Sequence, residues 1–375
     1  MKSHFKFRHF PQLDSLRGLA VLLVVMGHVV EFSNTTLTGV ANAIAQLGVM
    51  LFFILSGFLI TGLLYRERIE TGQVSLVNFY ARRFLRLGPA LFLFLGVVSL
   101  LVVFKKITDV PVYEIAVCLL YVRNIFGRSS SLAHIWSLSL EEQFYLLWPQ
   151  VVKRVRLDRL LTATVILTML MCIWRGAAIQ LQLFDYNTGV FYIRPYFRFD
   201  SILIGCCISL ALAQSDMVLA RLAMLAKRVP ATAAWMILLV WTIWGEGWSR
   251  PLYITVQMLG GAFVLLQLIL HEPRSLSVLK ASAPLQYLGK ISYSLYLWQQ
   301  VFLVTKYPDW GILRAFPTNV LLTFACAMAS YHLVESPILR LKRRFESRAP
   351  SAPSPEPDAK HAWTMAPAGK EAASG

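Results

Sequence analysis

The first long apolar stretch of the sequence carries two polar side chains at helical spacing. It reads LDSLRGLAVLLVVMGHVV, with Arg17 and His28 eleven residues apart. At 100° per residue the two side chains project from one helix face, about 16 Å apart along the axis. An imidazole can act as a general base and a guanidinium can bind phosphate. The spacing favours one polar pathway along this helix, with a snorkelling arginine and a satisfied buried histidine as the alternative.

A cluster of cations precedes the third apolar stretch. Arg82, Arg83 and Arg86 occur in the segment FYARRFLRLGP. Spacings of three and four residues gather guanidinium groups on one side of a helix, and their planar forks suit phosphate groups. The segment predicts a phosphate-binding cluster. The alternative is the ordinary positive charge of a cytoplasmic loop.

Two adjacent carboxylates, Glu141 and Glu142, lie in the segment HIWSLSLEEQFYLLWP. A carboxylate here is predicted to orient His28 or to take a proton itself, whereas a solvated helix end is the alternative. The same segment carries Trp136 and Tyr145 as further candidates. Trp136 also fits an aromatic belt at the membrane interface.

Other polar groups inside apolar stretches need partners. Arg198 and Asp200 are two residues apart, so they do not face each other on one helix, and each requires a partner on another helix. Ser292 and Tyr296 are four residues apart and share a face, which suits a site lining or hydrogen-bonded helix packing. The histidines and cysteines show no spacing typical of metal ligands, so no metal is expected.

Membrane-spanning helices must position these residues. Of the 375 residues, 57% are hydrophobic and only 15% are charged, against about a quarter charged in soluble domains. This composition excludes a soluble enzyme, a disordered chain and a disulfide scaffold, and it predicts an all-α, polytopic membrane helical bundle. The predicted spans cover residues 13–31, 46–65, 87–104, 136–152, 160–181, 197–214, 231–248, 252–270, 286–305 and 318–338.

The loops predict the topology. In a soluble protein, the net charge of +16 would suggest binding to nucleic acid. Here the Lys and Arg residues are concentrated in the even-numbered connections between spans, and the odd-numbered connections have few. This alternation is the pattern that the positive-inside rule requires. Ten transmembrane helices with both termini cytoplasmic fit this pattern. Residues 111–126 are expected to be re-entrant or interfacial. Residues 1–345 form the predicted transmembrane domain and 346–375 a disordered cytoplasmic tail.

Seven segments together resemble the acyltransferase-3 family of integral membrane O-acyltransferases. They are LDSLRGLAVLLVVMGH, LFFILSGFLIT, FYARRFLRLGP, IWSLSLEEQFYLLWP, FRFDSILIG, LGKISYSLYLW and YHLVESP, and they cover roughly residues 10–345. The resemblance implies ten spans in the bacterial cytoplasmic (inner) membrane. It also implies transfer of an acyl group, commonly acetyl, from cytoplasmic acyl-coenzyme A (acyl-CoA, as acetyl-CoA) to a sugar hydroxyl of a surface or exported glycan or glycolipid.

The resemblance assigns roles to some of the polar residues. Arg17 and His28 match its catalytic pair, the acidic position falls on Glu141 or Glu142, and Arg198 with Asp200 matches an R-x-D motif. The arginines before the third span match Arg82, Arg83 and Arg86. Two departures stand out. Gln299 replaces a histidine common in the family, so no proton transfer is assigned there, and the extracytoplasmic hydrolase-like domain of many members is not expected.

The mechanism expected from these residues is direct acyl transfer. The arginines hold the coenzyme phosphates on the inner side, and His28, oriented by Glu141, activates the sugar hydroxyl, with Arg198 or a backbone N–H stabilising the oxyanion. A covalent acyl-enzyme on Ser137, Ser139 or His28 is an alternative. A glycan-lipid or small-molecule transporter or flippase without acyl transfer, and a structural scaffold, are competing classes. The acyl group, the acceptor and the oligomeric state stay open.

Overall fold

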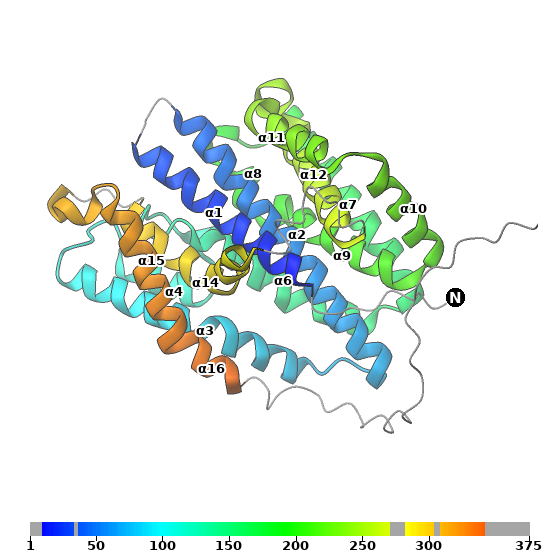
Figure 1. Cartoon of the computed structure of the whole chain (residues 1–375), viewed down its shortest axis with the longest axis horizontal. Coiled ribbons are helices and arrows are strands. Elements are labelled where there is room, and N and C mark those ends of the chain that lie inside the picture. The colour runs from blue at the N-terminus through cyan, green and yellow to red at the C-terminus, as the bar shows by residue number, and fades with distance from the viewer. Residues whose placement is uncertain (1–9, 34–36, 271–281, 304–307, 342–375) are drawn as a thin grey trace, which may run out of the picture.

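The computed structural model describes residues 10–33, 37–270, 282–303 and 308–341, and all regular structure in those ranges is helical. The bundle is shown in Figure 1. The long helices are α1 (Pro11–Ser33), α2 (Thr38–Thr71), α3 (Leu76–Val103), α6 (Ile135–Arg154), α7 (Leu157–Gln180), α9 (Pro195–Gln214), α11 (Ala231–Trp248), α12 (Arg250–Leu270), α14 (Ala283–Leu303) and α15 (Thr318–Ser330). The shorter helices are α4 (Val112–Leu119), α5 (Arg123–Phe126), η2 (Tyr186–Thr188), α8 (Val190–Ile193), α10 (Asp216–Arg228), η4 (Pro308–Arg314), the π-helix η5 (Tyr331–Glu335) and α16 (Ser336–Leu341).

Each of the ten predicted spans coincides with one of the long helices, which confirms an all-α multi-pass membrane protein. Within the described residues, 6 helices are long and apolar enough to cross a membrane, and the pair α10 and α11, bent by 82°, would make a seventh. The helices α6 and α14 are not among the six, because their polar residues lower the mean hydropathy of each helix. The count of ten and the cytoplasmic termini stay predictions, and the tail 346–375 lies outside the described residues.

The segment 111–126 does not form a span. It folds into α4 with 8 residues and α5 with 4 residues, and at 1.5 Å per residue neither approaches the roughly 30 Å of a bilayer core. A re-entrant or interfacial segment, as expected from the loop charges, is compatible with this geometry.

The central helices approach one another at glycines. A Cβ added to Gly57 of α2 would lie 1.9 Å from the carbonyl oxygen of Ile202 on α9, and one added to Gly289 of α14 would lie 1.9 Å from that of Asp14 on α1. Small residues permit such backbone contact in membrane bundles. Gly57 therefore lets the backbones of α2 and α9 meet, as Gly289 does for α14 and α1.

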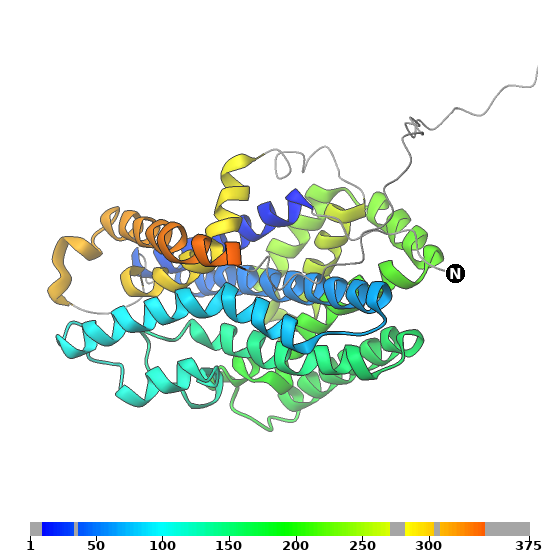
Figure 2. The same cartoon turned by 90° about the horizontal axis from the view of Figure 1, so that it is seen from below.

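Two apolar clusters pack around α1 and α2. The first joins these helices to α3, α6 and α14 and includes one face of α9, and the second joins them to α12 and to other residues of α9. Figure 1 shows α1 and α2 running between α3 with α14–α16 on one side and α7 with α9–α12 on the other, and Figure 2 shows the same bundle from below. We call the first side the cavity half and the second the sealed half.

Candidate active site

A cavity opens where five helices of the cavity half meet. Arg17 of α1 lines it together with Arg83 and Arg86 of α3 and Glu141 of α6. The remaining lining residues are Val49, Phe52, Phe53, Ser56, Leu87, Ser137, Leu138, Ser292, Tyr293 and Tyr296. Helices far apart in sequence thus bring three arginines, a carboxylate and several hydroxyl groups to one cavity.

The three neighbouring arginines of α3 do not act as one group. Arg83 donates to Glu142 at 3.0 Å, and its guanidinium lies 3.7 Å from the centroid of the Tyr145 ring. Arg82 instead donates to Glu67 of α2 at 3.2 Å and does not line the cavity. Adjacent helical residues diverge by about 100°, and the C-terminal part of α2 places a carboxylate on the side of Arg82. The expected cluster of three is therefore reduced at the cavity to Arg83 and Arg86, to which α1 adds Arg17.

The two carboxylates of α6 take different partners. Glu141 accepts a hydrogen bond of 2.7 Å from Ser56 of α2 inside the cavity, whereas Glu142 accepts the hydrogen bond from Arg83. The sequence prediction made Glu141 the group that orients His28. The structure pairs it with Ser56 instead, because Ser56 projects from the neighbouring helix at the level of Glu141.

Hydroxyl groups of α6 and α14 line the far part of the cavity. Ser137 and Tyr296 are joined at 2.5 Å between their oxygens, and the Tyr296 hydroxyl also donates to the carbonyl of His134 at 2.9 Å. Ser292, one turn before Tyr296, lines the same cavity, so the predicted shared face of these two residues is confirmed. Ser139 is fully buried and donates to the Ile135 carbonyl at 3.0 Å.

His28 is held by a residue to which the sequence assigned no proton transfer. Its Nδ1 lies 2.8 Å from Oε1 of Gln299, a fully buried residue of α14. An imidazole Nδ1–H donating to the amide oxygen leaves Nε2 without a proton. Gln299 thus favours the tautomer in which Nε2 can accept one.

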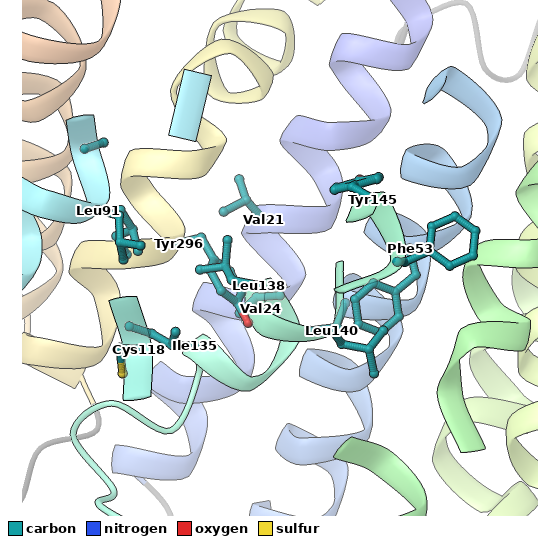
Figure 3. Close-up of a cluster of buried hydrophobic side chains, with 14 of the residues drawn as sticks. Val21, Val24, Phe53, Leu91, Cys118, Ile135, Leu138, Leu140, Tyr145 and Tyr296 are labelled. Atoms are coloured by element: carbon teal, nitrogen blue, oxygen red, sulfur yellow. The ribbon is translucent and has the colours of Figure 1, made fainter. Parts of the chain in front are cut away.

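Arg17 and His28 both face α14, as the spacing predicts, but the cavity lining reaches only Arg17. Val21 and Val24, which are 0% and 1% exposed, occupy the intervening turns of α1. Figure 3 shows them beside Leu138 and near Tyr296 in the apolar cluster. Tyr296 and Gln299 are three residues apart on α14, so the inner end of the cavity lies about 4.5 Å along that helix from the His28–Gln299 pair.

Arg198 and Asp200 lie in the sealed half. Asp200 is paired with Arg175 of α7, and both side chains are 0% exposed. Arg198 is 1% exposed, and none of its three guanidinium nitrogens has a hydrogen-bond partner. The partner on another helix is therefore found for Asp200 and not for Arg198.

Sequence reasoning missed two of the residues that organise these sites. Arg175 is the single charged residue in the apolar run CIWRGAA. A charge in a membrane span indicates that a partner is needed, so the sequence could have identified this residue. Gln299 was noted only as the replacement for a family histidine, because an uncharged amide in YLWQQ signals the need for a partner less strongly than a charge does. The described residues hold no group of three or more His, Cys, Asp or Glu side chains that could bind a metal ion.

Comparisons with known proteins place the chain in a family. Residues 10–332 match the family model described as an acyltransferase domain, so the chain belongs to this acyltransferase family. No solved structure matches the chain.

Among curated proteins, the chain is 28% identical over 370 residues to "Peptidoglycan O-acetyltransferase OatA" of Listeria monocytogenes, covering 90% of this chain and 57% of that protein. It is 28% identical over 357 residues to "O-acetyltransferase OatA" of Staphylococcus aureus, covering 88% and 57%. It is 30% identical over 369 residues to "Putative peptidoglycan O-acetyltransferase YrhL" of Bacillus subtilis, covering 88% and 55%. The chain therefore spans a little over half the length of these relatives.

Proposed function

We propose that this protein is a membrane O-acyltransferase that moves an acyl group, acetyl by analogy with the relatives, from acyl-coenzyme A to a sugar hydroxyl of a cell-wall or exported glycan. The observation that carries the proposal is the cavity itself. It joins three arginines to a set of hydroxyl groups, one helical turn from an imidazole whose tautomer is set by Gln299. The names of the relatives favour peptidoglycan as the acceptor.

The donor enters from the side of the arginines. Coenzyme A is a polyanion that lipid excludes, and guanidinium forks bind phosphate bidentately. Arg86 and Arg17 add positive charge to the cavity wall, Arg17 within 3.6 Å of the Asp14 carboxylate, and Arg83 adds a charge already stacked on Tyr145. The loop charges predict that this side is cytoplasmic. The uncharged pantetheine arm then extends toward Ser137 and Tyr296.

His28 supplies the base for the chemical step. Its Nε2 removes the proton of the sugar hydroxyl as the oxygen attacks the thioester carbonyl carbon. The carbon–sulfur bond breaks, and the departing thiolate receives that proton back from the imidazolium. Gln299 holds Nδ1–H throughout. The apolar contacts of Val21, Val24 and Leu138 keep water away from the thioester until the acceptor is in place.

Glu141 contributes from inside the cavity. Its hydrogen bond to Ser56 fixes the carboxylate among Arg17 and Arg83. We assign it the positioning of the arginines around the donor. Ser137 is the better placed of the two serines for the alternative covalent route, since it lines the cavity and Ser139 does not.

The test is acyl transfer across a vesicle membrane. The purified chain is reconstituted with labelled acetyl-coenzyme A enclosed inside and peptidoglycan fragments outside. Label on the glycan together with free coenzyme A thiol inside supports the proposal. Movement of a glycan lipid with no thiol release would support the transporter and contradict the enzyme.

A further inference from the structure

Arg198 is a buried cation that the proposed reaction does not use. It lies in the first turns of α9, its side chain is 1% exposed, and its Nε, Nη1 and Nη2 atoms have no hydrogen-bond partner. A guanidinium offers five N–H donors in a planar fork. Buried groups without a partner are rare in native structures and point to an ion, water or ligand that completes them.

The acid nearest in sequence cannot complete Arg198. Asp200 Oδ2 accepts from Arg175 and from the Cys172 thiol, and its Oδ1 accepts from Ser201. Arg175 also donates to the carbonyl of Phe197 and to Thr255. The three buried charged groups Arg175, Asp200 and Arg198 therefore sum to one uncompensated positive charge.

The surroundings of Arg198 favour an anion. Arg194, one turn earlier and at the N-cap of α9, also has a buried Nε without a partner. The positive end of the α9 dipole lies at this terminus and attracts anions. Two arginines with unpartnered buried nitrogens thus lie within one turn of each other at the start of one helix.

Phe53 connects this position to the cavity. The Arg198 guanidinium lies 5.5 Å from the centroid of the Phe53 ring, and Phe53 is one of the residues that line the cavity. The ring is also packed edge-on against Trp136, with 5.9 Å between ring centroids. The Phe53 ring therefore borders both the cavity and the Arg198 guanidinium.

We propose that Arg198 and Arg194 form an anion-binding subsite, screened from the cavity by Phe53, that takes a carboxylate or phosphate group. The bidentate match of guanidinium to these oxyanions sets the ligand class. Two sources supply that chemistry, namely a phosphate of the donor coenzyme and an acidic group of the acceptor glycan. The subsite itself does not depend on the proposed acyl transfer.

Anion binding is tested on the purified full chain in detergent. Its thermal midpoint is measured during titration with inorganic phosphate and, separately, with acetate, with ionic strength held constant by sodium chloride. An Arg17→Gln/Arg86→Gln background removes the two cavity arginines that are not paired with Glu142. The midpoint of this background should still rise with phosphate or acetate, and adding Arg198→Met should abolish the rise. No rise in the background, or an equal rise with Arg198→Met, would overturn the proposal.

The thermal midpoint in anion-free buffer shows whether Arg198 binds an anion or instead stabilises the fold. Replacing an uncompensated buried charge with an apolar side chain of similar size is neutral or stabilising. The midpoint of Arg198→Met in anion-free buffer should therefore equal or exceed that of the wild type. A sharp fall would show that the guanidinium holds the fold together and would overturn the proposal. Arg250→Met, which removes an exposed arginine stacked 4.9 Å from the Tyr186 ring, is the matched control.

Two measurements identify the source of the oxyanion: the affinity for coenzyme A and the KM for an acidic glycan fragment. If the coenzyme supplies it, Arg198→Met should weaken binding of coenzyme A in calorimetry by about tenfold or more, and Arg198→Lys, which keeps the charge and loses the fork, by less. If the acceptor supplies it, coenzyme A binding stays at the wild-type value and the KM for an acidic glycan fragment rises instead.

Discussion

Among the arginine–carboxylate pairs that join helices in this bundle, Arg83–Glu142 and Arg175–Asp200 differ most in what surrounds them. Arg83 and Glu142 keep 15% and 16% of their side chains exposed, and Arg83 lines the cavity. Arg175 and Asp200 are 0% exposed, and thiol, hydroxyl and carbonyl groups complete them. One charged pair therefore borders a cavity, and the other is enclosed by protein groups. The enclosed pair joins α7 to α9, and the cavity pair joins α3 to α6.

Breaking the enclosed pair should produce the largest effect on stability. Asp200→Leu leaves Arg175 buried without its counter-ion, which costs about 3–5 kcal/mol. We expect a large drop in the thermal midpoint and in the yield of folded protein in detergent. The double variant Arg175→Met/Asp200→Leu removes both charges and should recover most of the loss. A single variant as stable as the wild type would show that the pair contributes nothing.

Removing a cavity arginine should instead weaken donor binding with little change in stability. Hydrogen bonds to charged groups contribute about 1.5–3 kcal/mol, so Arg86→Gln should raise the Kd for coenzyme A roughly tenfold or more. Calorimetry on the detergent-solubilised chain measures it. An unchanged Kd for coenzyme A would show that Arg86 does not bind the donor and contributes only to the charge distribution that sets the membrane topology.

Changing Gln299 should affect the chemical step and leave donor affinity unchanged. Gln299→Leu removes one hydrogen bond worth about 1 kcal/mol, so kcat should fall about fivefold. Gln299→Glu places a carboxylate against the imidazole, which stabilises the protonated ring. The acidic limb of the pH–rate profile should then move to higher pH, so that activity at low pH is lost first. Gln300, which donates to the carbonyl of Ser130 at 2.7 Å, provides the control variant Gln300→Leu, whose pH profile should match the wild type.

The smallest effect is expected at Arg82. Its partner is Glu67, in a partly exposed ion pair of a kind that contributes about 0–1 kcal/mol. Arg82→Gln should leave coenzyme A affinity within about twofold of the wild type. A loss as large as that of Arg86→Gln would restore the cluster of three that the sequence predicts.

The sequence predicted the helices and the residues of the site better than their pairings. The apolar stretches and helical spacing located every long helix and placed Arg17, Ser292 and Tyr296 toward one interior. Local periodicity does not determine how one helix slides or rotates against another. It therefore could not show that Ser56 meets Glu141 or that Gln299 meets His28. These contacts depend on close approaches such as the one at Gly289, which only the packed bundle reveals.

The central claim is that His28, about one helical turn beyond the cavity, acts as the base on a donor held inside the cavity. The most direct measurement compares wild type and His28→Ala for acceptor-dependent release of coenzyme A thiol, with coenzyme A affinity determined on the same preparations. Loss of general-base catalysis should reduce the rate by roughly 10²–10⁴ and leave the Kd unchanged. Thiol release at the wild-type rate by His28→Ala would contradict the account.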